Sequence, residues 1–245
     1  YKYVIDNASN SATGLDGLPY EAWRPAGDSA VTTISLIGNE LMADRPAPVG
    51  SIFGLVNIPK GGEELDATEV NRDPKDTRPI NLKNADNEIV SGALNSSVRP
   101  ALRASVNKLQ NGVCPGRQMG QNVIDLDSHA RKTAMLHQSY EKNSPSLMET
   151  RQVINKGKVN RMPVMPFFDF CAAFPSVAHE WLFFCLQAIQ APRGFINGVR
   201  RLYEDCKCFS NINGEYIHIF MILAGILQGC PLSGTLFDIC IDSLA

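Results

Sequence analysis

The sequence predicts a mixed fold of the α+β class, in which helices and short strands follow one another without an internal repeat. Between residues 84 and 110, apolar residues recur every three or four positions, which is the spacing of one helix face. At 213–214, an Asn-Gly pair separates two runs of alternating apolar residues, the strongest short-range signal for a β-hairpin. The length of 245 residues and the hydrophobic fraction of 44% are sufficient for a substantial core.

The first half of the chain is expected to begin with loops, because residues 1–30 are rich in glycine, proline and aspartate. A polar, acidic loop is expected over 63–77, and a polar connector over 141–160. Apolar patterns predict the remaining elements in this order: a helix at 31–42, strands at 51–62 and 78–84, a long helix at 84–110 and a helix at about 120–140.

The second half is expected to start with a buried strand over 162–170, the run MPVMPFFDF. Helices follow at 178–189 and 192–205, and Pro192 suits the first turn of the second one, where a missing N–H is tolerated. The predicted hairpin covers 206–221. The last segment, GILQGCPLSGTLFDICIDSLA, is expected to form a glycine turn that leads into an apolar helix.

Cysteine, histidine and hydropathy patterns restrict the class of protein. The seven cysteines are odd in number and include no pair of CxxC units, and the four histidines lack metal-ligand spacing, so we expect reduced thiols in an intracellular protein. No apolar run reaches the roughly 18 residues of a membrane span, and the N-terminus does not resemble a signal peptide. Because Tyr1 is not a methionine, the chain is expected to begin inside a longer reading frame.

The net charge of -2 conceals a basic middle segment. Residues 1–98 carry 8 Lys and Arg against 14 Asp and Glu, residues 99–161 carry 11 against 4, and residues 162–245 carry 4 against 7. A cation cluster of this kind can follow a phosphate backbone. Charge alone favours the alternative, a solvated helix face.

One acidic residue, Asp169, stands in the almost wholly apolar run FFDFCAAFPSVAHEWL. A buried carboxylate is costly unless it is paired or binds a metal ion. Its position therefore predicts a hidden partner or a ligand role, and the alternative is a cap at the end of a strand.

Several short motifs in a fixed order resemble those of reverse transcriptases from non-LTR (LINE-type) retrotransposons. DFCAAF resembles their first catalytic motif, GILQGCPLSGTLF their Gln-Gly motif, NIPKGG with DTRPINLKN their fingers strands, TGLDGLP an upstream turn and CPGRQ a basic loop. The resemblance covers residues from about 13 to 245. It implies a right-hand polymerase fold, with a fingers region and N-terminal extension over 1–160 and a partial palm over 161–245.

The resemblance also implies an RNA-directed DNA polymerase that transfers dNTPs onto a primer with two Mg²⁺ ions. Asp169 would be the catalytic metal ligand, because Mg²⁺ prefers carboxylate oxygens, and the backbone carbonyl of Phe170 would be another ligand. Phe174 would form the floor under the incoming sugar and select deoxynucleotides. In the same family, residues matching Gln228 and Gly229 line the nucleotide pocket.

Two predicted fingers cations complete the implied substrate site. Lys60 and Arg78 resemble the residues that grip the triphosphate, and adjacent strands would let both reach one anion. As bare residues, each reads as an ordinary surface charge. Arg117 would contact the template or primer, and a purely structural role explains it equally well.

The chain departs from the family pattern at several positions. Pro175 replaces a usual Asp and Gly234 a usual Pro, and both change local backbone freedom. The second catalytic motif, an aromatic-x-Asp-Asp hairpin, does not occur, since no Asp-Asp pair is present; Asp238 and Asp242 do not replace it. We therefore expect a fold truncated before this hairpin, and residues that do not polymerise alone.

The expected partners are an RNA template, a DNA primer, dNTPs and other domains of a parent polyprotein, such as an endonuclease and a thumb. Action in the nucleus and translation in the cytoplasm are expected for such an element. The alternatives are a non-catalytic RNA-binding scaffold with a polymerase-like core, or a degenerate element remnant. A viral RNA-dependent RNA polymerase is disfavoured by the aromatic Phe174, and a relative of group II introns is a further possibility.

Overall fold

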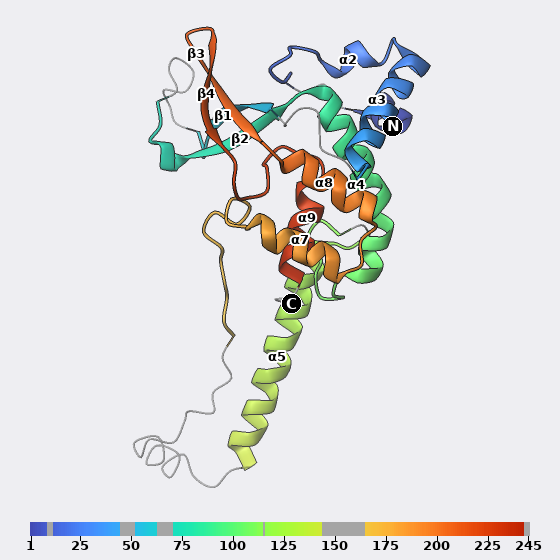
Figure 1. The fold of residues 1–245 in the computed structure, drawn as a ribbon. Coiled ribbons are helices and arrows are strands. Elements are labelled where there is room, and N and C mark those ends of the chain that lie inside the picture. Colours follow the sequence, from blue (N-terminus) through green and yellow to red (C-terminus); the bar gives the residue numbers. More distant parts are fainter. Residues whose placement is uncertain (9–11, 45–51, 63–70, 115, 144–164, 243–245) are drawn as a thin grey trace. The chain divides into compact units, whose positions relative to one another are not determined.

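The computed structural model describes residues 1–8, 12–44, 52–62, 71–114, 116–143 and 165–242 (Figure 1). The chain divides into two compact units. The larger unit consists of Tyr1–Pro115 and Ala172–Ala245, and the smaller one of Gly116–Cys171. The predicted boundary at residue 160 lies outside the described residues, and the assignment of fingers and palm to 1–160 and 161–245 stays a prediction.

A four-stranded sheet forms one part of the larger unit, with the strand order β2-β1-β3-β4 (Figure 1). β1 pairs with β2 in antiparallel and with β3 in parallel orientation, and β3 pairs with β4 in antiparallel orientation. The sheet therefore joins two segments that are far apart in the sequence. The strands are β1 (Ile52–Pro59), β2 (Thr77–Lys83), β3 (Lys207–Ile212) and β4 (Glu215–Met221).

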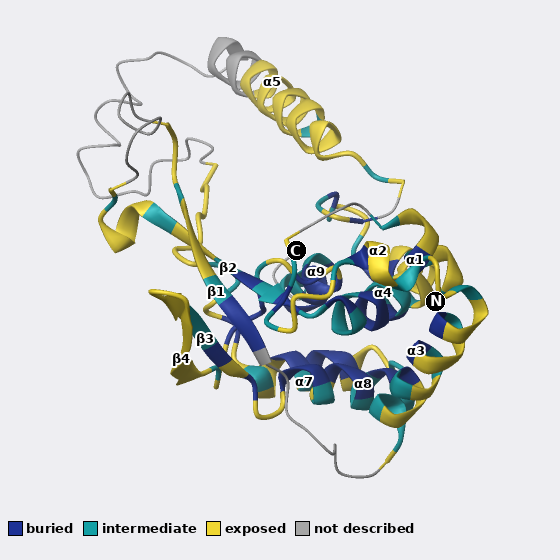
Figure 2. Ribbon diagram, turned by 90° about the horizontal axis from the view of Figure 1, so that it is seen from above, coloured by how far each residue is buried: buried dark blue, intermediate teal, exposed yellow. Residues whose placement is uncertain are grey.

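Helices supply most of the core of the larger unit. α3 packs against α8, and α7 packs against α8 and α9. Figure 2 shows the buried residues concentrated on β1 and on α4, α7, α8 and α9. The helices are α1 (Lys2–Asn7), α2 (Tyr20–Trp23), α3 (Gly27–Met42), α4 (Ala85–Ser105), α7 (His179–Ala188), α8 (Arg193–Tyr203) and α9 (Ser233–Ile241), with a short 3-10 helix at Pro74–Asp76.

The local patterns explain where these helices lie. In α4, the predicted apolar face supplies the buried side chains of Ile89, Val90 and Leu94. Acidic residues occupy its first turn and Arg103 its last, as the helix dipole favours. Pro192 is the N-cap of α8, one position before the first helical residue where the sequence pattern put it.

The structure confirms four predicted helices and strands of the larger unit and the predicted hairpin. The helix at 31–42, the two strands around the acidic loop and the long helix at 84–110 correspond to α3, β1, β2 and α4. The hairpin turns at Asn213-Gly214, where both residues have positive φ angles of 55° and 91°. None of the seven cysteines, all of which belong to the described residues, takes part in a disulfide. Within the described part of the chain, the helices are too short or too polar to cross a bilayer.

The smaller unit contains α5 (Met119–Asn143), which confirms the helix predicted at about 120–140. Its side chains at Met119, Val123 and Ile124 are 60–69% exposed. Most of the predicted connector over 141–160 lies outside the described residues.

The prediction of a buried strand over 162–170 is wrong for the residues that the structure describes. Residues 165–170 form no strand and all are exposed, with Phe167 at 75% and Phe168 at 85%. A strand needs a neighbour that pairs with its N–H and C=O groups, and none of the four described strands pairs with this segment. An apolar run alone cannot supply that partner. Residues 162–164 lie outside the described part.

Candidate functional site

The hairpin of β1 and β2 carries the two cations that the sequence singled out. Ile58 lies opposite Arg78 in the register, and the backbone N–H of Lys60 donates to the carbonyl of Asp76 at 2.8 Å. Lys60 directly follows β1, two positions after Ile58, so Lys60 and Arg78 belong to the same end of the hairpin. Both residues are exposed, and the Lys60 ammonium donates to the Lys75 carbonyl at 2.7 Å.

The Gln-Gly turn packs directly on β2. The backbone N–H of Asn81 donates to the carbonyl of Gln228 at 2.9 Å, three residues from Arg78 along the strand. Gly229 has a φ of +102°, and a Cβ atom there would lie 2.8 Å from the Asn81 carbonyl oxygen. Only glycine meets both constraints, because an L side chain disfavours this φ and the strand backbone cannot yield. The turn therefore lies against the strand that carries Arg78.

The loop around Phe174 is joined to the residues just before this turn. The N–H groups of Gly225 and Ile226 donate to the carbonyls of Val177 and Phe174 at 2.7 and 2.8 Å. A Cβ atom at Gly225 would lie 2.9 Å from backbone atoms of Pro175, so the two segments approach this closely only because residue 225 is glycine. Phe174, Gln228 and Gly229 consequently belong to one connected region of the larger unit.

The ring of Phe174 is half-buried and stacks on Phe237 of α9, with ring centroids 4.6 Å apart and planes at 14°. This contact ties the Phe174 loop to the helix that follows the Gln-Gly turn. Gly234, the second departure from the family pattern, packs against the Val113 side chain, which a Cβ atom at Gly234 would approach to 2.7 Å.

Three side chains that the sequence analysis did not identify hold the turn in place. Ser233 Oγ donates to the carbonyl of Leu227, and the N–H of Leu227 donates to the Tyr203 hydroxyl at 3.4 Å. His179 Nε2 lies 3.0 Å from the carbonyl oxygen of Gly225. Of these three residues, only Ser233 has a recognisable position in the sequence, because it is the first residue of an apolar helix. Nothing in the local sequence around Tyr203 or His179 indicates a contact with the turn.

The remaining predicted site residues belong to the smaller unit. Asp169 is exposed, Phe170 is 53% exposed and Arg117 is half-buried. The inference that Asp169 is a buried carboxylate is therefore wrong, because its strand does not form and leaves the side chain in water. The larger unit contains the other five predicted site residues, which are Lys60, Arg78, Phe174, Gln228 and Gly229. The roles of all eight residues stay predictions.

The described residues do not form a complete metal site. They contain no cluster of three or more His, Cys, Asp or Glu that could hold an ion. Asp169 contributes one carboxylate, and the sequence has no Asp-Asp pair to complement it. A divalent ion in a protein usually requires several oxygen ligands, so these residues fit it only in part.

Asp238 and Asp242 have a structural setting instead. Asp238 is 2% exposed, and burial, followed by the nearby carboxylate of Asp242, raises its pKa to about 7. Asp242 accepts a hydrogen bond from the backbone N–H of Asn107 at 2.8 Å. The Asp242 carboxylate thus attaches the end of α9 to the loop after α4.

Comparison with known proteins gives concordant matches. The family model described as reverse transcriptase (RNA-dependent DNA polymerase) matches residues 58–245. The chain is 25% identical over 237 residues to the Transposon TX1 uncharacterized 149 kDa protein of Xenopus laevis, covering 95% of this chain and 16% of that protein. It is 26% identical over 173 residues to the Retrovirus-related Pol polyprotein from type-2 retrotransposable element R2DM of Drosophila melanogaster, covering 70% of this chain and 14% of that protein.

These matches confirm the resemblance to non-LTR retrotransposon proteins that the motifs indicated. The matched region includes the last two residues of β1, all of β2, the Phe174 loop and the Gln-Gly turn. The chain spans less than a fifth of the length of either relative. Because the family model covers most of its residues, the chain belongs to the reverse transcriptase (RNA-dependent DNA polymerase) family.

Proposed function

We propose that this chain is part of an RNA-directed DNA polymerase of a retroelement, and that the β1–β2 hairpin and the Gln-Gly turn form its site for the incoming dNTP. The observation that carries this proposal is the seating of the turn on β2, through the Asn81–Gln228 hydrogen bond and the close approach of Gly229 to Asn81. It places the two residues of the turn beside the strand that carries Arg78.

Each residue has a role that its chemistry supports. Lys60 and Arg78 present two exposed cations at the same end of the hairpin, where a triphosphate can accept charge-assisted hydrogen bonds. Gln228 and Gly229 provide a turn without a bulky side chain at its closest point. Phe174 selects deoxyribose by occupying the space of a 2′-hydroxyl. Phosphoryl transfer depends mainly on such positioning and charge neutralisation.

Reverse transcriptases as a family use divalent metal ions. For the complete polymerase, we assign Asp169 and the Phe170 carbonyl as two ligands of Mg²⁺, which would supply charge neutralisation at the transferred phosphate. Because the described residues provide no further ligands beside them, no chemical step is assigned to this chain alone.

Larger partners follow from the size of the relatives, which are several times longer than this chain. We infer that the parent protein carries further domains, such as a thumb and an endonuclease, and that it acts in the nucleus on an RNA template and a DNA primer. Arg117 is the candidate contact with one of these strands.

A second candidate is a non-catalytic RNA-binding scaffold with a polymerase-like core. It is favoured by the single carboxylate at Asp169 and by the absence of an Asp-Asp pair in these 245 residues. Under this alternative the basic segment would bind RNA, whereas dNTPs would not bind selectively.

Binding of a dNTP to the chain separates the two candidates. We would measure the affinity for Mg·dTTP by equilibrium dialysis and compare Arg78→Gln with Arg99→Gln, another exposed arginine that lies on α4. Loss of a charge-assisted contact worth about 1.5–3 kcal/mol weakens binding roughly tenfold or more. Equal affinities for the two variants, or no binding by the unaltered chain, would favour the scaffold.

Primer extension tests the proposed metal ligand. In the complete parent polymerase, Asp169→Ala should abolish extension of a DNA primer on an RNA template, whereas Glu215→Gln on the exposed strand β4 should leave it unchanged. The 245-residue chain alone should not extend a primer. Extension by that isolated chain with Mg²⁺ would show that the second catalytic motif is dispensable, contrary to this proposal.

A further inference from the structure

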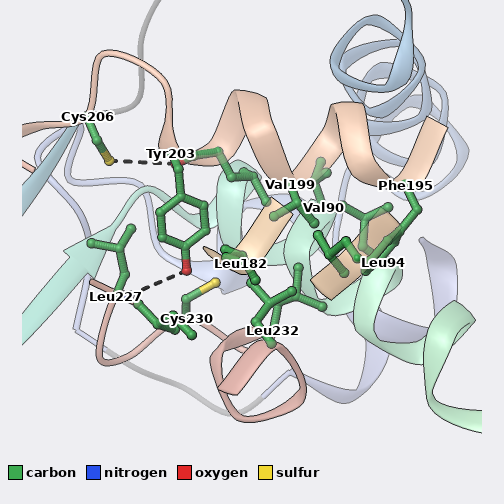
Figure 3. Close-up of a cluster of buried hydrophobic side chains, with 14 of the residues drawn as sticks. Val90, Leu94, Leu182, Phe195, Val199, Tyr203, Cys206, Leu227, Cys230 and Leu232 are labelled. Atoms are coloured by element: carbon green, nitrogen blue, oxygen red, sulfur yellow. Dashed lines mark hydrogen bonds between the residues drawn. The ribbon is translucent and has the colours of Figure 1, made fainter. Parts of the chain in front are cut away.

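Tyr203 lies at the end of α8, where several contacts with the Gln-Gly turn converge. It is 3% exposed, in the buried cluster between the helices (Figure 3). Its hydroxyl points toward Leu227, the residue immediately before Gln228, as the dashed line in Figure 3 marks. A buried phenol hydroxyl generally requires a hydrogen-bond partner, and here that partner is backbone of the turn.

Side chains hold both backbone groups of Leu227. Its N–H donates to the Tyr203 hydroxyl at 3.4 Å, and its carbonyl accepts from Ser233 Oγ. The next carbonyl, that of Gln228, accepts from Asn81 of β2 at 2.9 Å. Since consecutive peptide groups are held from different directions, the orientation of the turn depends on the position of the Tyr203 ring.

The ring itself is held by two neighbours that also lie beside the turn. The Lys83 ammonium lies 5.8 Å from the ring centroid, and Lys83 follows Asn81 by two residues on β2. The His179 ring meets it edge-on at 5.3 Å, while His179 Nε2 lies 3.0 Å from the Gly225 carbonyl oxygen. The Tyr203 ring therefore contacts side chains of β2 and α7, two elements that also contact the turn and its flank directly.

Lys83 shows how strongly this arrangement is constrained. Lys83 is 2% exposed, and its ammonium group has no hydrogen-bond partner among the described residues. A buried cation without such a partner is costly, and the face of an aromatic ring partly offsets that cost. The Lys83–Tyr203 contact thus connects the strand of Arg78 to the turn independently of the backbone hydrogen bond.

We propose that Tyr203 is a positioning residue that orients the Gln-Gly turn for nucleotide binding, through its hydroxyl on Leu227 and its ring between Lys83 and His179. This inference rests on the proposed function for the role of the turn. Tyr203 touches no substrate in this arrangement and acts only through Leu227 and Gln228.

The test uses the 245-residue chain with Tyr203→Phe, and with Tyr216→Phe on β4, 53% exposed, as the matched control. Phenylalanine retains the ring between Lys83 and His179 and removes only the hydroxyl. We expect the amide of Leu227 to exchange hydrogen roughly five- to tenfold faster and the affinity for Mg·dTTP to fall by a similar factor. Exchange in α7 and α8 should stay unchanged, and the control should match the unaltered chain.

Ser233→Ala provides a second variant if Tyr203→Phe does not fold. It releases the Leu227 carbonyl from the other side, and we expect the same local loss of protection at Leu227 and Gln228. A local loss in either variant, with weaker dTTP binding, supports the positioning role.

Three results would overturn the inference: unchanged exchange at Leu227, a uniform rise in exchange across α7, α8 and α9, or local loss of protection with unchanged dTTP affinity. The uniform rise would identify Tyr203 as an ordinary core residue. If the unaltered chain binds no dTTP but Tyr203→Phe still loosens Leu227 alone, the proposed function fails for this chain while the role of Tyr203 in orienting the turn is supported.

Discussion

At the scale of single residues, Gly229 shows how one backbone position controls the candidate site. Its φ of +102° disfavours any L side chain, and a Cβ atom there would meet the carbonyl oxygen of Asn81 at 2.8 Å. Gly214 in the hairpin turn has a comparable φ of +91°, but a Cβ atom there would have no neighbour within 4 Å. Replacing either glycine by an L residue would therefore strain the backbone, but only at Gly229 would the new side chain also collide with a neighbouring strand.

We predict that Gly229→Ala destabilises the chain more than Gly214→Ala does. A strained φ costs roughly 1–2 kcal/mol in each variant, and the displaced strand should add at least about 1 kcal/mol to Gly229→Ala. Urea unfolding of both variants measures the difference. Equal losses of unfolding free energy would show that the turn moves away from β2 without cost.

The raised pKa of Asp238 leads us to predict that the stability of the chain depends on pH. Burial and Asp242 raise its pKa from 3.8 to about 7. Between these values the folded chain holds a proton that the unfolded chain has released, so the unfolding free energy falls as pH rises from about 4 to about 7 and then levels off. The pKa values of Asp86 and Glu88 are also raised, mainly by burial, and contribute in the same direction.

Asp238→Asn should therefore reduce this pH dependence without abolishing it. Urea unfolding at several pH values between 4 and 8 provides the measurement, with Glu215→Gln as a control on the exposed strand β4. We expect the asparagine variant to lose less stability over this range than the control does. Parallel curves for the two variants would mean that folding does not raise the pKa of Asp238.

At the scale of secondary-structure elements, the signals that predicted structure correctly are local. The three- and four-residue spacing in 84–110 and the Asn-Gly turn at 213–214 depend on neighbours within the same element. The run 162–170 carries an equally apolar signal, but a strand exists only with a partner elsewhere in the chain. Residues 165–170 have no such partner among the described strands, so the strand predicted from their apolar pattern does not form.

The candidate site divides in the same way. The motifs, read through their resemblance to a family, pointed to Gln228, Gly229 and Arg78. They did not indicate that Tyr203 and His179 hold the turn, because a tyrosine at the end of one helix and a histidine at the start of another have no periodic or turn signal. Such contacts depend on tertiary packing, and the spacing of residues along the sequence does not predict them.

Proteolysis tests the exposed state of 165–170. Chymotrypsin cleaves after large aromatic residues, and Phe167 and Phe168 are 75% and 85% exposed, whereas Phe53 and Phe195 are 0% and 7% exposed. We predict that cleavage after Phe167, Phe168 or Phe170 precedes cleavage after the buried phenylalanines, as peptide mass mapping would show. Protection of 165–170 comparable to that of Phe53 would mean that the strand does form.

At the scale of the whole molecule, the sheet explains why residues distant in the sequence share one site. β3 adds to β1 in parallel, so residues 207–209 lie beside residues 52–54. The segment after β4 then passes the Phe174 loop and reaches β2 at Gln228. Site residues from 78, 174 and 228 are thus connected within the larger unit by the topology and not by their spacing.

The charge pattern of the whole chain supports a final prediction. Residues 99–161 carry 11 Lys and Arg against 4 Asp and Glu, although the chain has a net charge of -2. If this segment contacts a phosphate backbone, the logarithm of the association constant for single-stranded RNA should fall linearly with the logarithm of the salt concentration. Each phosphate contact should contribute about 0.7 to the magnitude of that slope. Lys108 and Lys132 are exposed members of this segment.

We predict that replacing Lys108 and Lys132 together by glutamine lowers the magnitude of that salt slope by roughly 1.4, since two phosphate contacts are lost. The matched control replaces Lys2 and Lys75, which belong to the acidic segment and pair with Asp6 and Asp73 at 3.5 and 3.3 Å. Fluorescence anisotropy with a labelled RNA at 50–300 mM salt measures the slopes. Equal slopes in the two double variants would mean that the basic segment is a solvated surface, and that RNA contacts arise elsewhere in the chain.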